Sequence, residues 1–352
     1  MIKAYFKKHT LNFKQASGTS RGVLINKDTW LLFLEENGTV GIGECAMFRG
    51  LSCDDQPDYE IKLAWLCENI NKAKEELFKE LNTYPSIVFG MEMAFESLKS
   101  EDPFNLFPSR FTEGKDSIDI NGLIWMGSVD FMKQQIKDKI KSGFSCIKMK
   151  IGAIDFETEL NLLKSIRNEF SENDIQLRVD ANGAFQAVEA LEKLKCLSEL
   201  QLHSIEQPIK QGQLEEMSKL CEQTPLPIAL DEELIGIHDV TKKRALLHII
   251  NPQYIILKPS LVGGFKSSEA WIQLAEEQHV GWWFTSALES NVGLNAIAQY
   301  TYTKQSNLPQ GLGTGGLFTN NFDSPLEVGN GHLHYNPNKA WQMDLKDTNL
   351  NI

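Results

Sequence analysis

The first hundred residues combine strand-like and helical patterns. Apolar runs between residues 24 and 43 are broken at Glu36-Asn37-Gly38, and an Asn-Gly pair between apolar runs predicts an antiparallel hairpin. Residues 58–82 and 85–99 follow as two helical segments, the second with proline at its start, a favoured first helical position. We therefore predict an α+β capping domain over residues 1–105.

Beyond the turn-rich stretch 100–117, short strand-like runs alternate with helical stretches. Strands that alternate with helices indicate parallel βαβ units, and eight of them favour a closed barrel over an open doubly wound sheet, which stays the alternative. The predicted fold is α/β, a (β/α)7β-type TIM barrel over residues 106–319, with the C-terminal segment 320–352 packed back on the capping domain. The eight runs are IDINGLIWMG, CIKMKIG, QLRVDANG, SIEQPI, PIALDEEL, YIILKPS, WWFTSALE and LPQGLGTGG.

Charged residues recur near the ends of five successive strands. They are Lys150, Asp180, Glu206, Asp231 and Lys258, separated by 25 to 30 residues. This spacing is about one βα unit, so a barrel would bring all five side chains to the rim formed by the carboxyl ends of its strands. Each residue alone would be interpreted as part of a surface ion pair, but five in phase favour one shared site.

Asp180, Glu206 and Asp231 form the acidic part of this predicted site, with no Cys or His in phase with them. Oxygen-only ligands suit Mg²⁺ better than Zn²⁺, and Mn²⁺ could replace Mg²⁺. Three converging carboxylates would repel one another, so a divalent cation also explains how they stay ionised.

Two lysines, Lys148 and Lys150, occupy one face of a single strand because side chains two residues apart share a face. Lys258 would approach from the far side of the barrel. Burial and neighbouring cations lower the pKa of a lysine from about 10.4 toward the range useful for a general base. The pattern therefore predicts abstraction of a proton from a carbon next to a carboxylate, whose enediolate a metal would stabilise.

Composition narrows the partners to small molecules. The 352 residues carry a formal net charge of -12 and a pI near 5.2, which argues against binding nucleic acid. No apolar run approaches the length that spans a bilayer, and the start lacks the apolar core of a signal peptide, so we expect no membrane contact and a cytoplasmic location. Six scattered cysteines suit reduced thiols. The sequence assigns no oligomeric state.

The same motifs resemble the enolase superfamily, in its muconate-lactonizing subgroup. The resemblance covers nearly the whole chain and is carried by GIGECA in the capping domain, by KMK, DANG, IEQP, ALDE and LKPS along the barrel, and by the helix that starts at Pro85. Within the subgroup, TSALESNVGLNAIAQ from Thr285 and GLGTGGLF from Gly311 are most similar to the o-succinylbenzoate synthase family.

This resemblance implies the dehydration of 2-succinyl-6-hydroxy-2,4-cyclohexadiene-1-carboxylate, a small carboxylate, with Mg²⁺ as cofactor. Lys150 would remove the proton α to the ring carboxylate and then protonate the departing hydroxyl. Lys258 would stay cationic and stabilise the enediolate, and Lys148 would contribute charge and orientation.

The resemblance also implies that the capping domain closes the site through two mobile loops, near residues 13–21 and 47–53. Arg21 is a candidate for the succinyl carboxylate, although a solvated loop arginine is the alternative interpretation. Further candidates at the strand ends are Asn182, Ser286, Gly313 and Thr314.

Three other patterns do not predict function. GTSRG, at residues 18–22, matches a nucleophile elbow but precedes a strand instead of opening a helix. GLGTGG does not have the spacing of a dinucleotide site. His332 and His334 share a strand face near the C-terminus, and two ligands alone make a poor metal site, so we expect a structural pair.

Two alternatives to the dehydratase stay open. An N-acylamino-acid racemase or dipeptide epimerase on the same scaffold would use Lys150 and Lys258 as opposed acid and base. The sequence lacks the Asp-x-Asp expected of a dipeptide epimerase after the eighth strand. Against mandelate-racemase-like chemistry, it has no histidine at the end of the seventh strand. A barrel that only binds ligands is the alternative from another class, and the complete set of carboxylates and lysines argues against it.

Overall fold

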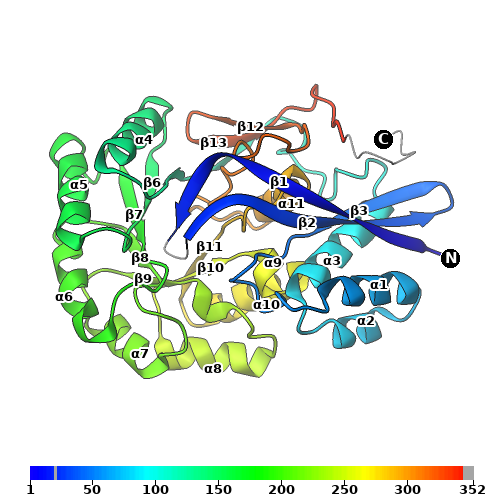
Figure 1. The fold of residues 1–352 in the computed structure, drawn as a ribbon, viewed down its shortest axis with the longest axis horizontal. Helices are drawn as coiled ribbons and strands as arrows, with labels where there is room; N and C mark the ends of the chain where they lie inside the picture. Colours follow the sequence, from blue (N-terminus) through cyan, green and yellow to red (C-terminus); the bar gives the residue numbers. More distant parts are fainter. Residues whose placement is uncertain (20–21, 344–352) are drawn as a thin grey trace.

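The computed structural model describes residues 1–19 and 22–343, with an antiparallel sheet at one end and parallel strands at the other (Figure 1). Within the described residues, the sheet has the order β1 (Lys3–Thr19), β2 (Gly22–Glu36), β3 (Thr39–Cys45). Asn37 and Gly38 have φ of 52° and 86°, the left-handed values of a tight hairpin turn. The predicted hairpin is confirmed.

The helical region that follows this sheet begins with two helices where one was predicted. The single helix over 58–82 is wrong, because α1 (Tyr59–Asn69) ends and α2 (Lys74–Glu80) begins after a short break. In the break, the side chain of Asn71 accepts from the backbone N–H of Ile2 at 2.9 Å and donates to its carbonyl at 2.8 Å. These bonds hold the break against the start of β1.

Helix α3 (Pro85–Lys99) packs tightly on β3. A Cβ atom on Gly43 would lie 1.9 Å from the carbonyl oxygen of Gly90, so only glycine fits this approach. Strand β2 buries both faces. Trp30, Leu32 and Leu34 pack with α1 and α3, while Leu31 and Phe33 belong to the core shared with the barrel.

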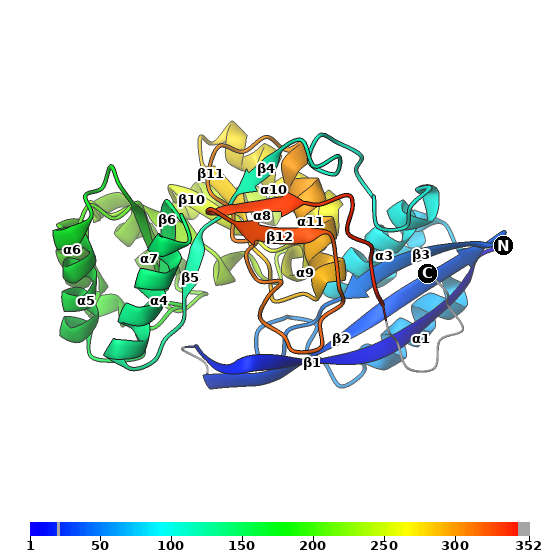
Figure 2. The ribbon, with the colours of Figure 1, turned by 90° about the horizontal axis from the view of Figure 1, so that it is seen from above.

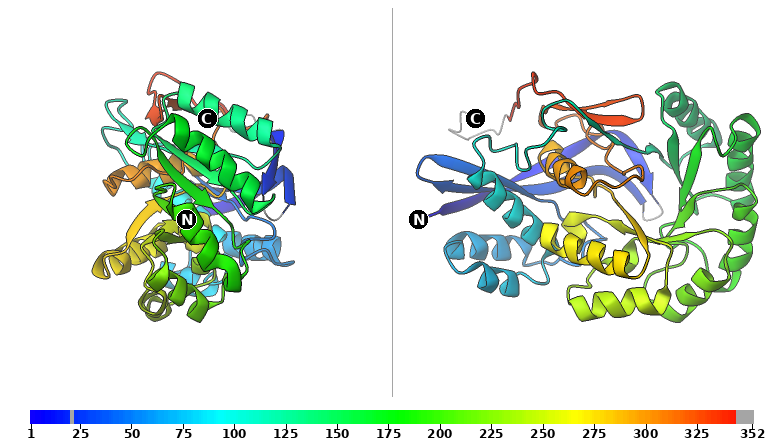
Figure 3. Two further views of the ribbon diagram at one scale, coloured as in Figure 1. Left: turned by 90° about the vertical axis from the view of Figure 1, so that its left-hand side faces the viewer. Right: turned by 180° about the vertical axis from the view of Figure 1, so that it is seen from behind.

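A parallel sheet and the helices that follow its strands form the centre of the second part of the molecule and confirm the α/β fold class (Figures 1 and 3). In the described chain the sheet comprises β5 (Gly122–Ile124), β6 (Cys146–Lys150), β7 (Gln176–Asp180), β8 (Ser204–Glu206), β9 (Ile228–Leu230), β10 (Tyr254–Leu257) and β11 (Gly281–Phe284). The helices between and after them are α4 (Val129–Lys141), α5 (Phe156–Glu169), α6 (Ala187–Ser198), α7 (Leu214–Gln223), α8 (Val240–Ile250), α9 (Pro259–Val262), α10 (Gly264–Glu277) and α11 (Asn291–Thr303), with a 3-10 turn, η1 (Glu232–Leu234), after β9.

A seam closes the barrel where an eighth strand was predicted. Gln310 donates its N–H to Asp119 at 2.8 Å and accepts from the N–H of Asn121 at 2.9 Å, while Gly311 forms a parallel bridge with Thr285. The LPQGLGTGG run therefore contributes bridges in place of a regular strand. It contains a proline and several glycines, which weaken strand pairing.

The first predicted barrel strand is divided in two. Its start forms β4 (Ser117–Asp119), which pairs antiparallel with β13 (His332–Tyr335), and β13 in turn pairs with β12 (Leu326–Gly329) (Figure 2). Its second half forms β5 and pairs in parallel with β6. The C-terminal hairpin thus covers the seam of the barrel.

Segment 320–343 contacts residues 1–105 as well as strand β4. Asn320 exchanges hydrogen bonds of 2.8 Å with the backbone of Asn12 and Thr10 in β1, and Trp341 stacks on Phe104 with 4.1 Å between ring centroids. We propose a division into a capping domain of residues 1–105 and a barrel domain of residues 106–319, with the C-terminal segment packed on the capping domain.

The predicted loop over residues 13–21 is wrong for the residues that the structure describes. Strand β1 continues to Thr19, and Ser17, Gly18 and Thr19 pair with the start of β2. Long β-ribbons of this kind are stabilised by their backbone ladder. Arg21 lies outside the described residues. No helix in the described part of the chain is both long and apolar enough to cross a membrane.

Candidate active site

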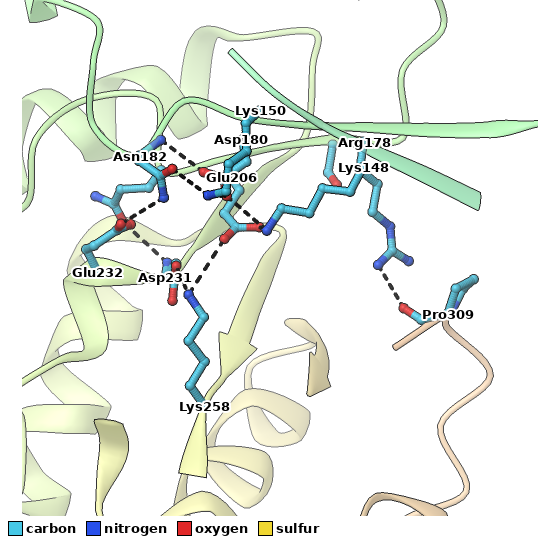
Figure 4. Close-up of polar contacts among 12 residues, drawn as sticks. Lys148, Lys150, Arg178, Asp180, Asn182, Glu206, Asp231, Glu232, Lys258 and Pro309 are labelled. Carbon is cyan, nitrogen blue, oxygen red and sulfur yellow. Dashed lines mark hydrogen bonds and ion pairs between the residues drawn. The ribbon is translucent and has the colours of Figure 1, made fainter. Parts of the chain in front are cut away.

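The charged residues predicted from strand spacing are brought together in one buried cluster (Figure 4). Lys150, Asp180 and Glu206 end β6, β7 and β8 and stand opposite one another in the strand register. Asp231 and Lys258 directly follow β9 and β10. The carboxylates are 1 to 3% exposed and Lys258 is 9% exposed. The alternative interpretation of these charged residues, as separate ion pairs on the surface, is therefore wrong.

Lys148 and Lys150 both reach the carboxylates from β6, as their two-residue spacing predicted. Lys148 Nζ forms ion pairs with Glu206 Oε2 and, at 2.9 Å, with Asp180 Oδ2. Lys150 Nζ donates to the same Asp180 oxygen at 3.0 Å and to Asn182 Oδ1 at 2.7 Å. Asp180 therefore links the two lysines of one strand face.

Lys258 approaches the cluster from β10, on the other side of the carboxylates (Figure 4). Its Nζ pairs with Asp231 Oδ2 and lies 4.0 Å from Glu206 Oε1. Lysine ammonium groups thus face the acidic cluster from both β6 and β10. This is the arrangement of opposed lysines that the sequence predicted.

Asn182 and Gln207 hold the loops after β7 and β8. Asn182 adopts a left-handed φ of 44°, and its side chain donates to Glu232 Oε1 at 3.0 Å while accepting from Lys150. Gln207 Oε1 accepts from the backbone N–H of Asp231 at 3.2 Å. Side-chain amides therefore fix the geometry around both a lysine and a carboxylate, and nothing in the sequence pattern identified Gln207.

The pKa values reflect this close pairing. Burial opposes the charged form of Lys148, but Asp180 and Glu206 outweigh it and raise the lysine's pKa. Burial likewise opposes the charged form of Lys258, but Asp231, Glu206 and Glu232 together outweigh it and raise the pKa of this lysine. The carboxylates thus hold both residues as ammonium ions, which is the charged state that the resemblance implied for Lys258, and the lowered pKa expected of a general-base lysine does not apply to them.

The carboxylates respond differently to the same surroundings. Burial would raise the pKa of Asp180, but Lys148 and Lys150 lower it well below its usual range. Burial and the charge of Asp180 raise the pKa of Glu206. The surroundings thus favour the charged form of Asp180 and disfavour that of Glu206.

The donor set fits a hard divalent cation. Asp180, Glu206 and Asp231 offer only oxygen, and Glu206 Oε1 is buried without a hydrogen-bond partner among the described residues. Across the described chain, no three acidic, histidine or cysteine side chains stand in coordinating geometry, because ammonium groups lie between the carboxylates. A cation bound here would compete with Lys148 and Lys258 for the same oxygens.

A cavity opens beside the cluster, and its polar wall contains the candidates from the strand ends. Lys148, Lys150, Asp180, Asn182 and Lys258 line it, together with Ser286, Gly313 and Thr314. Ser286 Oγ accepts a hydrogen bond from Thr314 Oγ1 at 2.9 Å. The role of each of these residues stays a prediction.

The apolar wall of the cavity was not predicted from the sequence. Leu24, Phe48 and Leu51 come from the capping region, and Trp125, Leu288 and Leu317 come from the barrel side. Their hydrophobicity resembles that of core residues, so the pattern gave no separate signal. Phe48 and Leu51 do lie within the predicted closing segment 47–53.

His332 and His334 lie on β13, away from the lysine and carboxylate cluster. His332 Nδ1 lies 2.8 Å from Asp119 Oδ1 on β4, and His334 Nε2 lies 3.3 Å from the carbonyl oxygen of Gly329. Both contacts link neighbouring strands of the seam. These contacts are consistent with the structural interpretation of the pair, which stays a prediction.

Comparison with known proteins agrees with this geometry. Residues 132–339 match the family model described as enolase C-terminal domain-like. The chain belongs to the enolase superfamily. Among superfamily members, it is 45% identical to the o-succinylbenzoate synthase of Desulfotalea psychrophila, over 93% of this chain and 97% of that protein.

Solved structures of the enolase superfamily share the fold. The crystal structure of MenC from Desulfotalea psychrophila LSv54 has a TM-score of 0.85 and 41% identity, and the match covers 95% of this chain and 99% of that one. The substrate-liganded L-Ala-D/L-Glu epimerase from Bacillus subtilis has a TM-score of 0.82 at 18% identity, covering 95% of both chains. The latter likeness shows the fold alone.

Proposed function

We propose that this protein is an o-succinylbenzoate synthase, a hydro-lyase of menaquinone biosynthesis. It would dehydrate 2-succinyl-6-hydroxy-2,4-cyclohexadiene-1-carboxylate to 2-succinylbenzoate. The observation that carries the proposal is the 45% identity to an o-succinylbenzoate synthase along nearly the full length of both chains. The opposed lysines around a buried carboxylate cluster support it.

Asp180, Glu206 and Asp231 would hold Mg²⁺, which Mn²⁺ could replace. When bound, the cation supplies Lewis-acid stabilisation for negative charge on the carboxylate of the substrate ring. A solved dipeptide epimerase from Enterococcus faecalis, similar in fold, is described as complexed with Mg. Glu206 Oε1, which accepts no hydrogen bond from the described residues, supports a cation at this position.

Lys150 would perform both proton transfers. As a neutral amine it takes the proton from the carbon α to the ring carboxylate, which breaks the C–H bond and leaves an enediolate. As an ammonium it then gives that proton to the 6-hydroxyl, which departs as water when the C–O bond breaks. Asp180 and Asn182 orient its Nζ, and the product ring gains aromaticity.

Lys258 and Lys148 would remain cationic throughout. Lys258 would stabilise the developing enediolate from the side of β10, where its pairing with Asp231 fixes the position of the ammonium. Lys148 lies between Asp180 and Glu206 and would offset their charge. The raised pKa of both lysines supports these roles.

The succinyl tail would occupy the cavity beside the cluster. Ser286, Gly313 and Thr314 would face it, Asn182 would line the pocket near the ring, and Arg21 would meet the terminal carboxylate. The apolar side chains of Leu24 and Phe48, which line the same cavity, would exclude water from the reacting ring.

A second candidate, an N-succinylamino acid racemase activity at the same site, is favoured by one observation. Lys150 and Lys258 reach the carboxylate cluster from β6 and β10, so a neutral Lys150 and the Lys258 ammonium would act as base and acid on opposite sides of a bound ligand. The N-succinylamino acid racemase of Thermus thermophilus is 33% identical over 47% of this chain. A barrel that only binds ligands would not need both lysines.

Ultraviolet absorbance tests the proposal, because the ring becomes aromatic during the reaction. Purified protein with Mg²⁺ should convert the hydroxycyclohexadiene acid, and Lys150→Ala should lower kcat by about 100- to 10,000-fold. Lys195→Ala, at a half-exposed lysine paired with Glu192, is the control and should keep the full rate. Full activity of Lys150→Ala would refute the mechanism. Deuterium exchange into N-succinyl amino acids would measure the racemase.

A further inference from the structure

A buried charged cluster lies between the antiparallel sheet and the barrel, separate from the metal-binding candidates. Lys27 comes from β2, Glu44 from β3 and Glu289 from the loop after β11. Both carboxylates are 0% exposed, and the buried Lys27 ammonium has no hydrogen-bond partner in the described part of the chain. Two acids therefore share the field of one cation.

The two carboxylates differ in the kind of donor they receive. Each oxygen of Glu44 accepts from a backbone N–H at the start of α11, Oε1 from Ser290 at 2.8 Å and Oε2 from Gly293 at 2.7 Å, and each also accepts from a hydroxyl, Thr29 Oγ1 or Ser290 Oγ. A backbone N–H can only donate. Glu289 accepts from two hydroxyls, those of Ser260 and, at 2.6 Å, Ser286. A hydroxyl can reverse and accept instead, so Glu289 can take up a proton without placing two donors against each other.

The hydroxyl on Ser286 continues a chain toward the cavity. Ser286 Oγ donates to Glu289 and accepts from Thr314 Oγ1 at 2.9 Å and from the N–H of Leu288 at 3.0 Å. Each hydroxyl carries one proton. While Glu289 is ionised, both protons point toward it, and Thr314 offers only lone pairs to the cavity that it lines.

The carboxylate of a ligand tail requires hydrogen-bond donors, so this direction of the hydrogen bonds from Thr314 through Ser286 to Glu289 disfavours binding of the tail. We propose that Glu289 is a positioning residue that takes up one proton from solvent when an anionic ligand tail binds, which turns Ser286 and Thr314 into donors. The new Glu289 O–H donates to Ser286, Ser286 donates to Thr314, and Thr314 donates into the cavity. The inference rests on the proposed function, because that function supplies a tail ending in a carboxylate.

The charges that face Glu289 set the direction of the pH dependence. Burial raises its pKa, Lys27 from β2 lowers it, and Glu44 from β3 raises it. Affinity for the tail should therefore fall as the pH rises through the pKa of Glu289 in the free protein, by up to about tenfold per pH unit. Lys27→Met removes the cation, so the fall should begin at higher pH.

Calorimetry of 2-succinylbenzoate binding to the Mg²⁺-loaded protein tests this directly. Titrations in two buffers of different ionisation heat give the number of protons taken up, from about pH 6 to pH 9. Wild type should take up as much as about one proton more than Glu289→Gln in the upper part of this range. Lysines near the metal contribute equally to both proteins, so the difference belongs to Glu289.

Two further variants keep the test decisive if Glu289→Gln does not fold. Lys27→Met should move the proton uptake to higher pH, and Thr314→Val should bind more weakly and lose the pH-dependent part. Equal proton uptake by wild type and Glu289→Gln, or an unmoved profile in Lys27→Met, would overturn the inference while turnover still supports the proposed function. Absence of both binding and turnover in wild type would overturn both.

Discussion

Glu44 joins the antiparallel sheet to the barrel, and its removal should destabilise the protein strongly. Its carboxylate accepts four hydrogen bonds, from Ser290 N–H, Ser290 Oγ, Gly293 N–H and Thr29 Oγ1. Glu44→Ala would leave these buried donors without an acceptor and Lys27 without its nearest compensating carboxylate. Breaking such a buried charged network costs about 3–5 kcal/mol.

The expected shift of the melting temperature follows from chain length. Unfolding entropy near 60 °C is about 2.1 cal/mol/K per residue, which for this 352-residue chain gives about 0.7 kcal/mol per degree. A loss of 3–5 kcal/mol should therefore lower Tm by about 4–7 °C. Glu44→Gln, which keeps one acceptor oxygen, should lie between wild type and Glu44→Ala.

Differential scanning calorimetry measures this shift, with Glu192→Ala as the matched control. Glu192 is 76% exposed in its side chain and forms an ion pair with Lys195 on the surface of α6, so its removal should change Tm by less than about 1 °C. A Tm for Glu44→Ala as close to wild type as that of the control would refute the view that this carboxylate holds the two parts together.

Three further predictions concern packing, the cavity and the metal. Gly43→Ala should destabilise the protein by about 1–3 kcal/mol or more in urea unfolding, because its Cβ would lie 1.9 Å from the Gly90 oxygen. The control is Gly329→Ala, whose added Cβ would meet no neighbouring atom of the described residues within 4 Å. Equal stabilities of the two variants would contradict the packing argument. Phe48→Ala should raise KM more than it lowers kcat in steady-state assays, because Phe48 lines the cavity; the 97% exposed Val188 gives the control Val188→Ala, and an unchanged KM would exclude Phe48 from substrate binding. Dialysis against EDTA should abolish turnover and added Mg²⁺ should restore it, whereas full turnover after dialysis would argue against a metal role for the carboxylates.

The sequence predicted the barrel and the charged cluster because both depend on regular spacing. Parallel strands place their carboxyl ends on one rim, so Asp180, Glu206 and Asp231 converge once the βα repeat is recognised. The hairpin at Asn37-Gly38 was also predictable, because a local turn signal sets it.

Features that depend on contacts between distant segments could not be predicted. The break after α1 depends on the hydrogen bonds between Asn71 and Ile2, which precedes β1. Strand β1 extends to Thr19 because β2 lies beside it. The role of Glu44 requires the start of α11, 246 residues further along. In each case the local pattern is the same with or without the distant partner.

The seam of the barrel has a consequence for synthesis of the chain on the ribosome. Strand β4, near residue 118, finds its antiparallel partner β13 only at residues 332–335, and residues 119–121 find theirs at Gln310. Most of the parallel strands can therefore pair while translation continues, yet the ring stays open until residues 310–335 have been synthesised. Closure over so long a loop costs little extra entropy, but it comes late. We therefore expect the edge of the parallel sheet next to β4 and β5 to stay unpaired during most of translation.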